Sequence, residues 1–184
     1  MPDSNITKRA LASAMKELMA HKPFAKISVG DICETCGMNR KSFYYHFRDK
    51  YDLVNWIYYT EFVEVMRRKT YEDNWEFIRD MCAYFYENRI FYVNALKVTG
   101  QDSFREYFGE VFRPIVQSAM EEAFESSRHR TFYAIFFTDA FLVSIERWLD
   151  EDSMPPEEFV GLLQAGIEGT ARRVVDRIDG QEAE

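Results

Sequence analysis

The chain has 184 residues, of which 47% are hydrophobic and 16% aromatic, so it can bury a sizeable core and is not a disordered protein. The formal net charge of −8 argues at first sight against a nucleic-acid partner, but the charges are unevenly distributed. Residues 1–50 hold nine Lys or Arg against five Asp or Glu, whereas residues 51–184 hold 14 against 26, which predicts that only the amino-terminal part meets phosphate.

Apolar residues at helical spacing predict a first helix that ends at Lys22-Pro23. Ser28, followed by Asp31 three residues later, resembles a capping box and predicts a second, short helix. Gly37 closes this helix, because glycine most readily takes the left-handed conformation that a sharp turn needs. These signals mark a helix, a short helix and a tight turn in chain order.

The next two helices carry signals of the same kind. Asn39 is a suitable N-cap for a helix over roughly residues 40–46, which Phe43 and Phe47 would anchor to the core. Asp49 is a suitable N-cap for the longer helix that follows. Further amphipathic segments come after it, and no hairpin signal separates alternating strands, so the predicted fold class is all-α.

Two short helices joined by a glycine turn are typical of a helix-turn-helix, whose second helix enters the major groove of DNA. The amino end of that second helix is polar and basic, where backbone N–H groups and the helix dipole favour phosphate. Arg40 and Lys41 can donate to guanine or to phosphate, and both alternatives stay open. The predicted DNA-contacting residues are Ser28, Asn39, Arg40, Lys41, Ser42, Tyr44, Tyr45, His46 and Lys50.

The remaining predicted contacts depend on hydroxyl, imidazole and ammonium groups. Tyr44, Tyr45 and His46 offer hydrogen bonds to phosphate and a flat apolar surface for a thymine methyl group. Ser28 and Lys50 begin the flanking helices, where they can hold the DNA backbone on either side. Two structural alternatives stay open, namely an ordinary solvated face for the basic residues and packing of Tyr44 onto the first helix.

The rest of the chain carries the signals of a larger helical domain. Breaks near Asp73-Asn74, Asn88-Arg89 and Gly100–Asp102 divide its first part into amphipathic helices. Residues 130–150 are apolar on nearly every side, which indicates burial on more than one side. Pro156, with two glutamates after it, begins the last helix.

The last predicted helix carries a stripe of small residues beside its apolar stripe. Glycine in a helix costs about 1 kcal/mol relative to alanine, so several together indicate that another helix packs very closely. In a chain of this size we expect that helix to belong to a second subunit, with an intrachain neighbour as the alternative. The predicted dimer interface comprises Phe137, Phe141, Trp148, Leu162, Ala165, Gly166 and Gly169.

Aromatic residues are concentrated after residue 50, where 25 of the 30 rings lie. Most of these rings must form core, and some can line a cavity for a small-molecule effector. The candidate ligand-binding residues are polar groups amid apolar ones in the middle helices: Arg89, Tyr92, Asn94 and Tyr107.

Taken together, ISVGDICETCGMNRKSFYYHFRDKYDL resembles the DNA-binding module of the TetR/AcrR transcriptional regulators. The matching residues are Ile32-Cys33, Cys36-Gly37-Met38, Tyr44 to Phe47, Lys50 and Asp52-Leu53. The resemblance covers roughly residues 6–57 and implies that Lys50 grips phosphate while Tyr44 and His46 contact the DNA backbone. More loosely, FFTDAFLVSIERWLDEDSMPPEEFVGLL resembles the regulatory domain of regulators related to the dihydroxyacetone-kinase activator DhaS, which implies no particular substrate pathway.

Cys33 and Cys36 form a C-x-x-C pair, which raises the alternative of a thiol-redox or metal-dependent protein. In the TetR/AcrR module these positions usually hold alanine on the buried side of a helix, where cysteine behaves as a small hydrophobe. A catalytic pair needs exposure at a helix amino terminus, and structural zinc needs two more ligands, for which no second C-x-x-C exists. We therefore expect core packing, with no metal and no cofactor.

We predict an all-α DNA-binding transcription regulator, not an enzyme, that acts as a homodimer on a palindromic operator. Residues 1–50 form a three-helix helix-turn-helix domain, and residues 51–184 form a larger helical regulatory and dimerisation domain. The chain would be a ligand-responsive repressor, with activation left open; the alternative is a helical interaction module without DNA binding. The lack of a signal peptide and of an apolar run of about 20 residues predicts a cytoplasmic protein.

Overall fold

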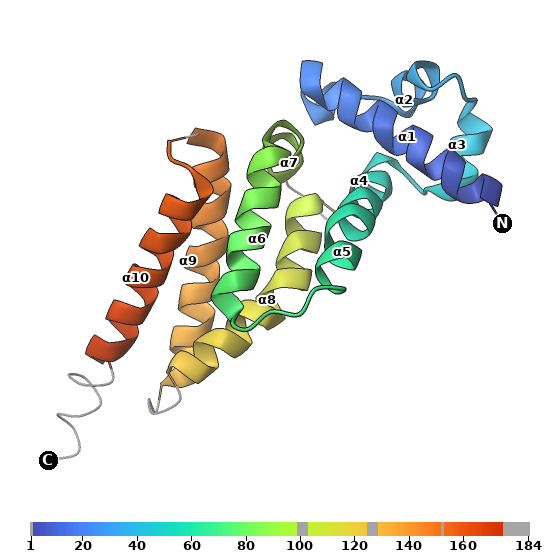
Figure 1. Cartoon of the computed structure of the whole chain (residues 1–184). Coiled ribbons are helices and arrows are strands. Elements are labelled where there is room, and N and C mark those ends of the chain that lie inside the picture. The colour runs from blue at the N-terminus through green and yellow to red at the C-terminus, as the bar shows by residue number, and fades with distance from the viewer. Residues whose placement is uncertain (1, 99–102, 125–128, 152, 175–184) are drawn as a thin grey trace, which may run out of the picture. The chain divides into compact units, whose positions relative to one another are not determined.

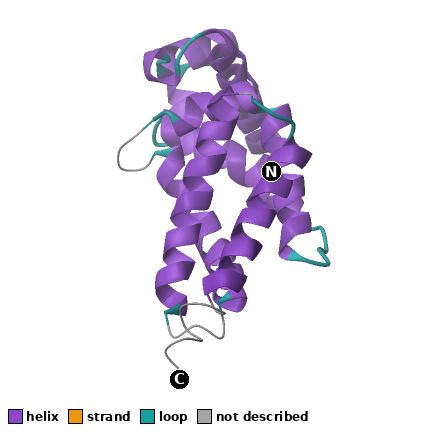
Figure 2. Ribbon diagram, turned by 90° about the vertical axis from the view of Figure 1, so that its left-hand side faces the viewer, coloured by secondary structure: helices purple, strands orange, loops and turns teal. Residues whose placement is uncertain are grey.

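The computed structural model describes residues 2–98, 103–124, 129–151 and 153–174, and within these ranges it contains helices and turns but no strand (Figures 1 and 2). The elements in chain order are α1 (Pro2–His21), the 3₁₀ turn η1 (Phe24–Lys26), α2 (Val29–Thr35), α3 (Arg40–His46), α4 (Lys50–Tyr58), the π-helical segment η2 (Tyr59–Val63), α5 (Glu64–Met66), α6 (Asn74–Glu87), α7 (Arg89–Leu96), α8 (Phe104–Ala123), α9 (Arg130–Glu151) and α10 (Pro156–Val174). The predicted all-α class is confirmed. The predicted break at Gly100–Asp102 lies outside the described residues.

The turn and caps predicted for the helix-turn-helix are present. Ser28 Oγ accepts from the N–H of Asp31 at 3.1 Å, while Asp31 Oδ2 accepts from the N–H of Ser28 at 2.7 Å, a reciprocal capping box. Gly37 has a φ of 67°, the left-handed conformation expected at the turn. The side chains of Asn39 and Asp49 accept hydrogen bonds at the starts of α3 and α4. These short-range signals therefore determine where α2, α3 and α4 begin.

The chain forms two compact units, one of residues 1–70 and 88–107 and the other of residues 71–87 and 108–184. The first unit contains α4, η2, α5 and α7 in addition to the three amino-terminal helices. The boundaries of these units differ from the predicted domain boundary after residue 50. That boundary concerns function and remains a prediction.

Packing against α1 explains the extent of the first unit. Helix α1 packs against α4 and α7 as well as α2 and α3. The side-chain amide of Asn94 on α7 donates to the carbonyl of Met19 at 2.8 Å. Phe43 of α3 is 0% exposed and Phe47 is 3% exposed, and full burial of a phenylalanine side chain contributes about 1.5–3 kcal/mol. These contacts give α3 a fixed, buried side.

Helix α4 continues through the π-helical segment η2 into α5. The N–H of Glu64 donates to the carbonyl of Tyr59, five residues earlier, instead of four as in an α-helix. Within η2, both carboxylate oxygens of Glu61 accept from Lys16 Nζ at 2.8 Å. This ion pair joins α1 to η2.

In the second unit, α6 packs against α9 and α10. Trp148 stacks on Phe159 of α10, with ring centroids 4.3 Å apart, and on Tyr86 of α6 at 5.6 Å. Its indole N–H donates to the carbonyl of Met154 at 2.9 Å. Trp148 is 3% exposed and Phe141 is 1% exposed. Both side chains are core residues of their own chain, which corrects their prediction as dimer-interface residues.

None of the described helices combines the length and apolar character needed to cross a membrane.

Candidate nucleic-acid interface

Helix α3 presents polar and aromatic side chains to solvent because Phe43 holds its opposite side in the core. Tyr44 is 58% exposed and Tyr45 is 82% exposed, which is unusual for large aromatic side chains. Arg40 and Lys41, on the first turn, are also exposed. The exposure of Tyr44 disfavours the alternative that this ring packs onto the first helix. The structure thus brings these four side chains together on one seven-residue helix.

Asn39, Ser42 and His46 are more engaged with the protein itself. Asn39 Oδ1 accepts from the backbone N–H of Ser42 at 2.9 Å and from its hydroxyl at 3.2 Å. His46, in the last turn of α3, is half-buried and meets the ring of Tyr45 edge-on at 4.9 Å. Asn39 and Ser42 therefore fix the start of α3, and their DNA contacts remain predictions.

Arg40 reaches from the start of α3 to the first turn of α2. A Cβ placed on Gly30 would lie 2.6 Å from Arg40 Nη2, 3.5 Å from Arg40 Cζ and 3.3 Å from Ser28 Oγ. The guanidinium group therefore lies over the backbone of Gly30, in the neighbourhood of the Ser28 hydroxyl. Sequence reasoning missed Gly30, whose only signal was a glycine in the first turn of a predicted helix.

Lys50, predicted to hold the DNA backbone, is directed in this structure at the turn before α2. Its Nζ donates to the carbonyls of Phe24 and Ile27 at 2.8 Å and to that of Ala25 at 3.3 Å. It also lies 4.4 Å from the centroid of the Phe24 ring, in reach of a cation–π interaction. An ammonium group has three donors, so all of them have acceptors within the chain. Lys50 thus ties the start of α4 to η1, and its phosphate contact stays a prediction.

The charge next to Ser28 is compensated within the protein. Asp31 accepts from the backbone N–H of Ser28 and lies 3.0 Å from Lys22 Nζ. The backbone hydrogen bond from Ser28, with help from Lys22, lowers the pKa of Asp31 to about 2. Asp31 is therefore ionised and paired near neutral pH.

The two cysteines of the C-x-x-C pair are placed as expected for packing residues. Cys33 is 3% exposed, and burial raises the pKa of its thiol. Cys36, half-buried at the end of α2, donates its S–H to the carbonyl of Ile32 at 3.2 Å. A raised thiol pKa disfavours the reactive thiolate. In the described parts of the chain, no three His, Cys, Asp or Glu side chains are grouped to hold a metal ion.

Exposed apolar residues form a stripe on α9 and another on α10. Those of α9 are 47–63% exposed: Phe132, Ile135, Phe136 and Val143. Those of α10 are Leu162, which is 59% exposed, and the exposed Ala165, Gly166 and Gly169. A Cβ added at Gly166 or Gly169 would meet no atom of the described chain within 4 Å, so no intrachain helix packs closely there. Phe137, predicted at the dimer interface, is instead half-buried and stacks on Phe124 at 5.3 Å.

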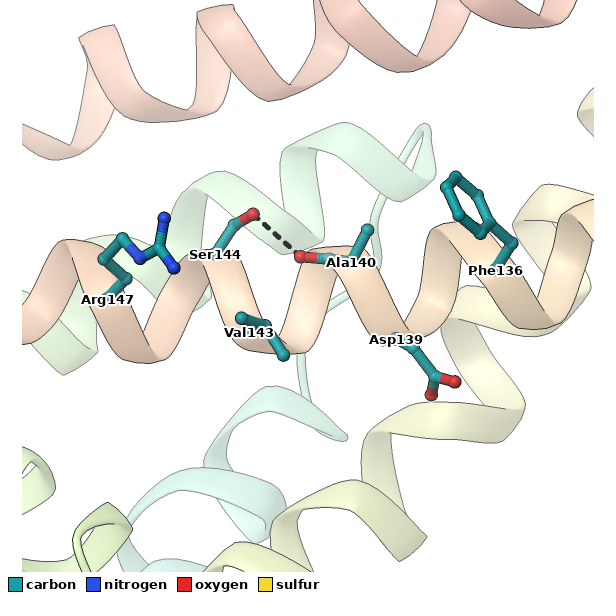
Figure 3. A pocket seen from close by; sticks show the side chains of 6 residues that line it. All are labelled: Phe136, Asp139, Ala140, Val143, Ser144 and Arg147. Atoms are coloured by element: carbon teal, nitrogen blue, oxygen red, sulfur yellow. Dashed lines mark hydrogen bonds between the residues drawn. The ribbon is translucent and has the colours of Figure 1, made fainter.

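An open pocket of about 440 Å³ follows the exposed side of α9 (Figure 3). Its lining residues are Phe136, Asp139, Ala140, Val143, Ser144 and Arg147. The hydroxyl of Ser144 donates to the carbonyl of Ala140 at 2.7 Å, and Asp139 pairs with Arg113 of α8. Since one helix supplies every lining residue, we interpret the pocket as a hollow in the exposed stripe of α9.

The four candidate ligand-binding residues lie in the first unit but do not form one site with free polar groups. Tyr92 is 1% exposed, and its ring and that of Tyr107 both meet Tyr58 edge-on, at 6.4 Å and 5.8 Å. Asn94 is bound to the carbonyl of Met19, and Arg89 is half-buried at the start of α7. Their ligand role remains a prediction.

Comparison with protein-family models identifies two matching segments. Residues 11–57 match the model described as bacterial regulatory proteins, tetR family. Residues 73–169 match the model of a transcriptional regulator C-terminal region from the same group. Together they cover α3 with its supporting helices and most of the second unit.

Among curated proteins, the chain is similar to the HTH-type dhaKLM operon transcriptional activator DhaS of Lactococcus lactis subsp. lactis (strain IL1403). The two are 33% identical over 93 residues, which make up 50% of each chain, so the match spans about half the length of that relative. This agrees with the looser resemblance seen in the carboxy-terminal sequence.

Solved structures with the same fold cover nearly the whole chain. The dihydroxyacetone kinase operon activator DhaS is 22% identical, with a TM-score of 0.61 over 89% of this chain and 97% of that one. NalD of Pseudomonas aeruginosa, the secondary repressor of the MexAB-OprM multidrug efflux pump, is 18% identical, with a TM-score of 0.63 over 91% and 96%. Regulators described as an activator and as a repressor thus share this fold.

Proposed function

The chain belongs to the TetR family of bacterial regulatory proteins and is a DNA-binding transcriptional regulator; on this premise we propose that it acts as a homodimer on a palindromic operator read by α3. In this proposal residues 1–50 bind DNA, and residues 51–184 dimerise and respond to a small-molecule effector. The protein then works in the cytoplasm as a ligand-responsive repressor.

The exposed face of α3 is the observation that carries the DNA-binding assignment. Arg40 and Lys41 supply positive charge, and the exposed rings of Tyr44 and Tyr45 supply hydroxyl groups and apolar surface. Such side chains contact phosphate oxygens, guanine edges and thymine methyl groups. A helical module without DNA binding has no need to keep two tyrosine rings this exposed beside two cations.

The stripes on α9 and α10 support the homodimer. Leu162 is 59% exposed, and the glycines next to it leave room for a helix to approach closely. A twofold dimer places two recognition helices on half-sites about 34–36 Å apart. An effector that binds one arrangement of the dimer more tightly than the other then changes DNA affinity.

DNA binding is tested with a duplex from the promoter region upstream of the protein's own gene. Lys41→Ala should weaken binding broadly and reduce the slope of log K against log salt by about one per bound subunit. Arg68→Ala, which removes an exposed positive charge just after α5, is the matched control and should leave that slope unchanged. Failure of the wild-type protein to bind the duplex above its affinity for random DNA would refute the proposal.

Dimerisation and the sign of regulation need separate measurements. Leu162→Glu should halve the molar mass measured by light scattering, whereas Val65→Glu, at another exposed apolar position, should not. In a reporter strain, deletion of the gene should raise promoter output for a repressor. Lower output after deletion would indicate an activator, as the Lactococcus lactis relative DhaS is described to be.

A further inference from the structure

We propose that Gly30 is a positioning residue, which lets the Arg40 guanidinium lie across α2 and form, with the Ser28 hydroxyl, a binding site for a DNA phosphate. This inference rests on the proposed DNA-binding function. It assigns Arg40 to the DNA backbone, a choice that the sequence pattern leaves open between phosphate and guanine.

The position of the guanidinium is the first argument. Arg40 belongs to α3, yet its Nη2 lies where a Cβ on Gly30 would approach to 2.6 Å, closer than real side chains allow. Arg40 is exposed, and in the parts of the chain that the structure describes it has no carboxylate partner. Its charge is therefore available at the surface where α2 and α3 meet.

The Ser28 hydroxyl supplies a second donor at the same place. Ser28 Oγ lies 3.3 Å from the position that a Cβ on Gly30 would take, and it accepts from the N–H of Asp31. Its hydroxyl hydrogen interacts with the Asp31 carboxylate, and rotation of the hydroxyl group turns that hydrogen towards an outside acceptor. The nearby Asp31 carboxylate is paired with Lys22 at 3.0 Å. A phosphate oxygen is an acceptor that suits both a guanidinium group and a hydroxyl group.

The backbone gives no reason for glycine at this position. Among the described glycines, a positive φ occurs at Gly37 and not at Gly30, so an alanine at position 30 would meet no backbone strain. Glycine within a helix also lowers stability relative to alanine. What glycine provides here is the space that the guanidinium occupies. A methyl group would move the flexible end of Arg40 away from Ser28 and leave the helix intact.

The test compares Gly30→Ala, Arg40→Ala and the double variant, with Gly109→Ala as the matched control. Gly109 also lies in a helix, and a Cβ there would meet nothing within 4 Å. Binding is measured by fluorescence anisotropy over a range of salt concentrations. Two duplexes are used, one from the promoter region of the gene and one of random sequence. Melting temperatures are measured on the same samples.

We expect Gly30→Ala to melt no lower than wild type, and about 2 °C higher if the full helix-propensity gain is realised. We expect it to bind both duplexes about tenfold more weakly, because a charge-assisted contact is lost. The salt slope should fall by about one per bound subunit. In the Arg40→Ala background, Gly30→Ala should have no further effect. Gly109→Ala should bind both duplexes like wild type.

Three results would overturn the assignment. Wild-type affinity in Gly30→Ala would show that Arg40 needs no space over Gly30. Equal losses from Gly30→Ala with and without Arg40 would show that the glycine acts independently of the guanidinium. A loss confined to the promoter duplex would assign Arg40 to a base edge. If the wild-type protein binds neither duplex, the proposed function itself is refuted.

Discussion

Replacing Lys50 with methionine tests whether this residue acts on the protein or directly on DNA. Methionine keeps an unbranched side chain over the Phe24 ring but removes the ammonium group that donates to three backbone carbonyls. Hydrogen bonds to charged groups contribute about 1.5–3 kcal/mol. Since Lys50 is half-exposed and the Ala25 bond is the longest at 3.3 Å, we expect a net loss of about 2 kcal/mol.

For a chain of this length, 1 kcal/mol corresponds to about 2–4 °C, so Lys50→Met should melt about 4–8 °C below wild type. The assay is thermal unfolding followed by circular dichroism, with all samples at one protein concentration because a dimer's melting temperature depends on it. Lys41→Met, at an exposed position of α3, is the control and should melt like wild type.

DNA binding below the melting range separates the two roles of Lys50. If Lys50 acts by holding η1 against the start of α4, Lys50→Met should bind DNA more weakly but with the salt slope of wild type. The phosphate contacts would remain, but fewer molecules would be in the conformation that binds DNA. A direct phosphate contact predicts a slope smaller by about one per bound subunit. An unchanged melting temperature together with that smaller slope would refute the structural role of Lys50 at η1.

Three further predictions concern a carboxylate, the cysteines and the core. The pKa of Asp31 is lowered to about 2 in the folded protein, so the contribution of its carboxylate to stability is complete above the ordinary pKa of 3.8 and is lost as pH falls towards 2. The melting-temperature difference between wild type and Asp31→Asn should therefore shrink between pH 4 and pH 2. A difference that stays constant over this range would contradict the prediction. Cys33→Ala combined with Cys36→Ala should leave DNA affinity intact, whereas complete loss of binding in a folded double variant would support the thiol-based alternative. Trp148→Ala should reduce the free energy of unfolding by about 3–5 kcal/mol in denaturant titrations, because it removes a buried ring that stacks on Tyr86 and on Phe159. A loss below about 1 kcal/mol would place Trp148 outside the core.

The helix boundaries of the DNA-binding part were predictable because their signals are local. Ser28 and Asp31 are three residues apart, Asn39 directly precedes α3, and Gly37 occupies the position that needs a positive φ. Each of these residues satisfies backbone groups within a few positions of itself, so a single sequence contains the information. For the same reason the predicted range of residues 40–46 matches α3 as observed.

The direction of side chains on α9 was not predictable in the same way. A helix that is apolar on nearly every side does not indicate which side meets its own chain, so Phe141 and Trp148 were assigned to the wrong surface. The answer depends on α6 and α10, which pack on α9 from other parts of the sequence. The contacts of Lys50 were not predictable for the same reason, because its carbonyl acceptors lie 23 to 26 residues away in the sequence.

The π-helical segment η2 has a consequence for how this chain tolerates insertions and deletions. A π turn accommodates one residue more than an α turn, so deletion of a single residue between Tyr59 and Val63 would let α4 and α5 join as a regular α-helix. Successive residues of an α-helix are about 100° apart, so a deletion within a regular α-helix rotates everything after it by roughly that angle. A deletion here removes only the extra residue of the π turn, so α5 keeps its orientation relative to α4. Met66, now 7% exposed, would therefore stay on the side that buries it. An alignment gap of one residue here would thus mark a relative whose helix lacks the π turn and still presents the same face from α5 onward.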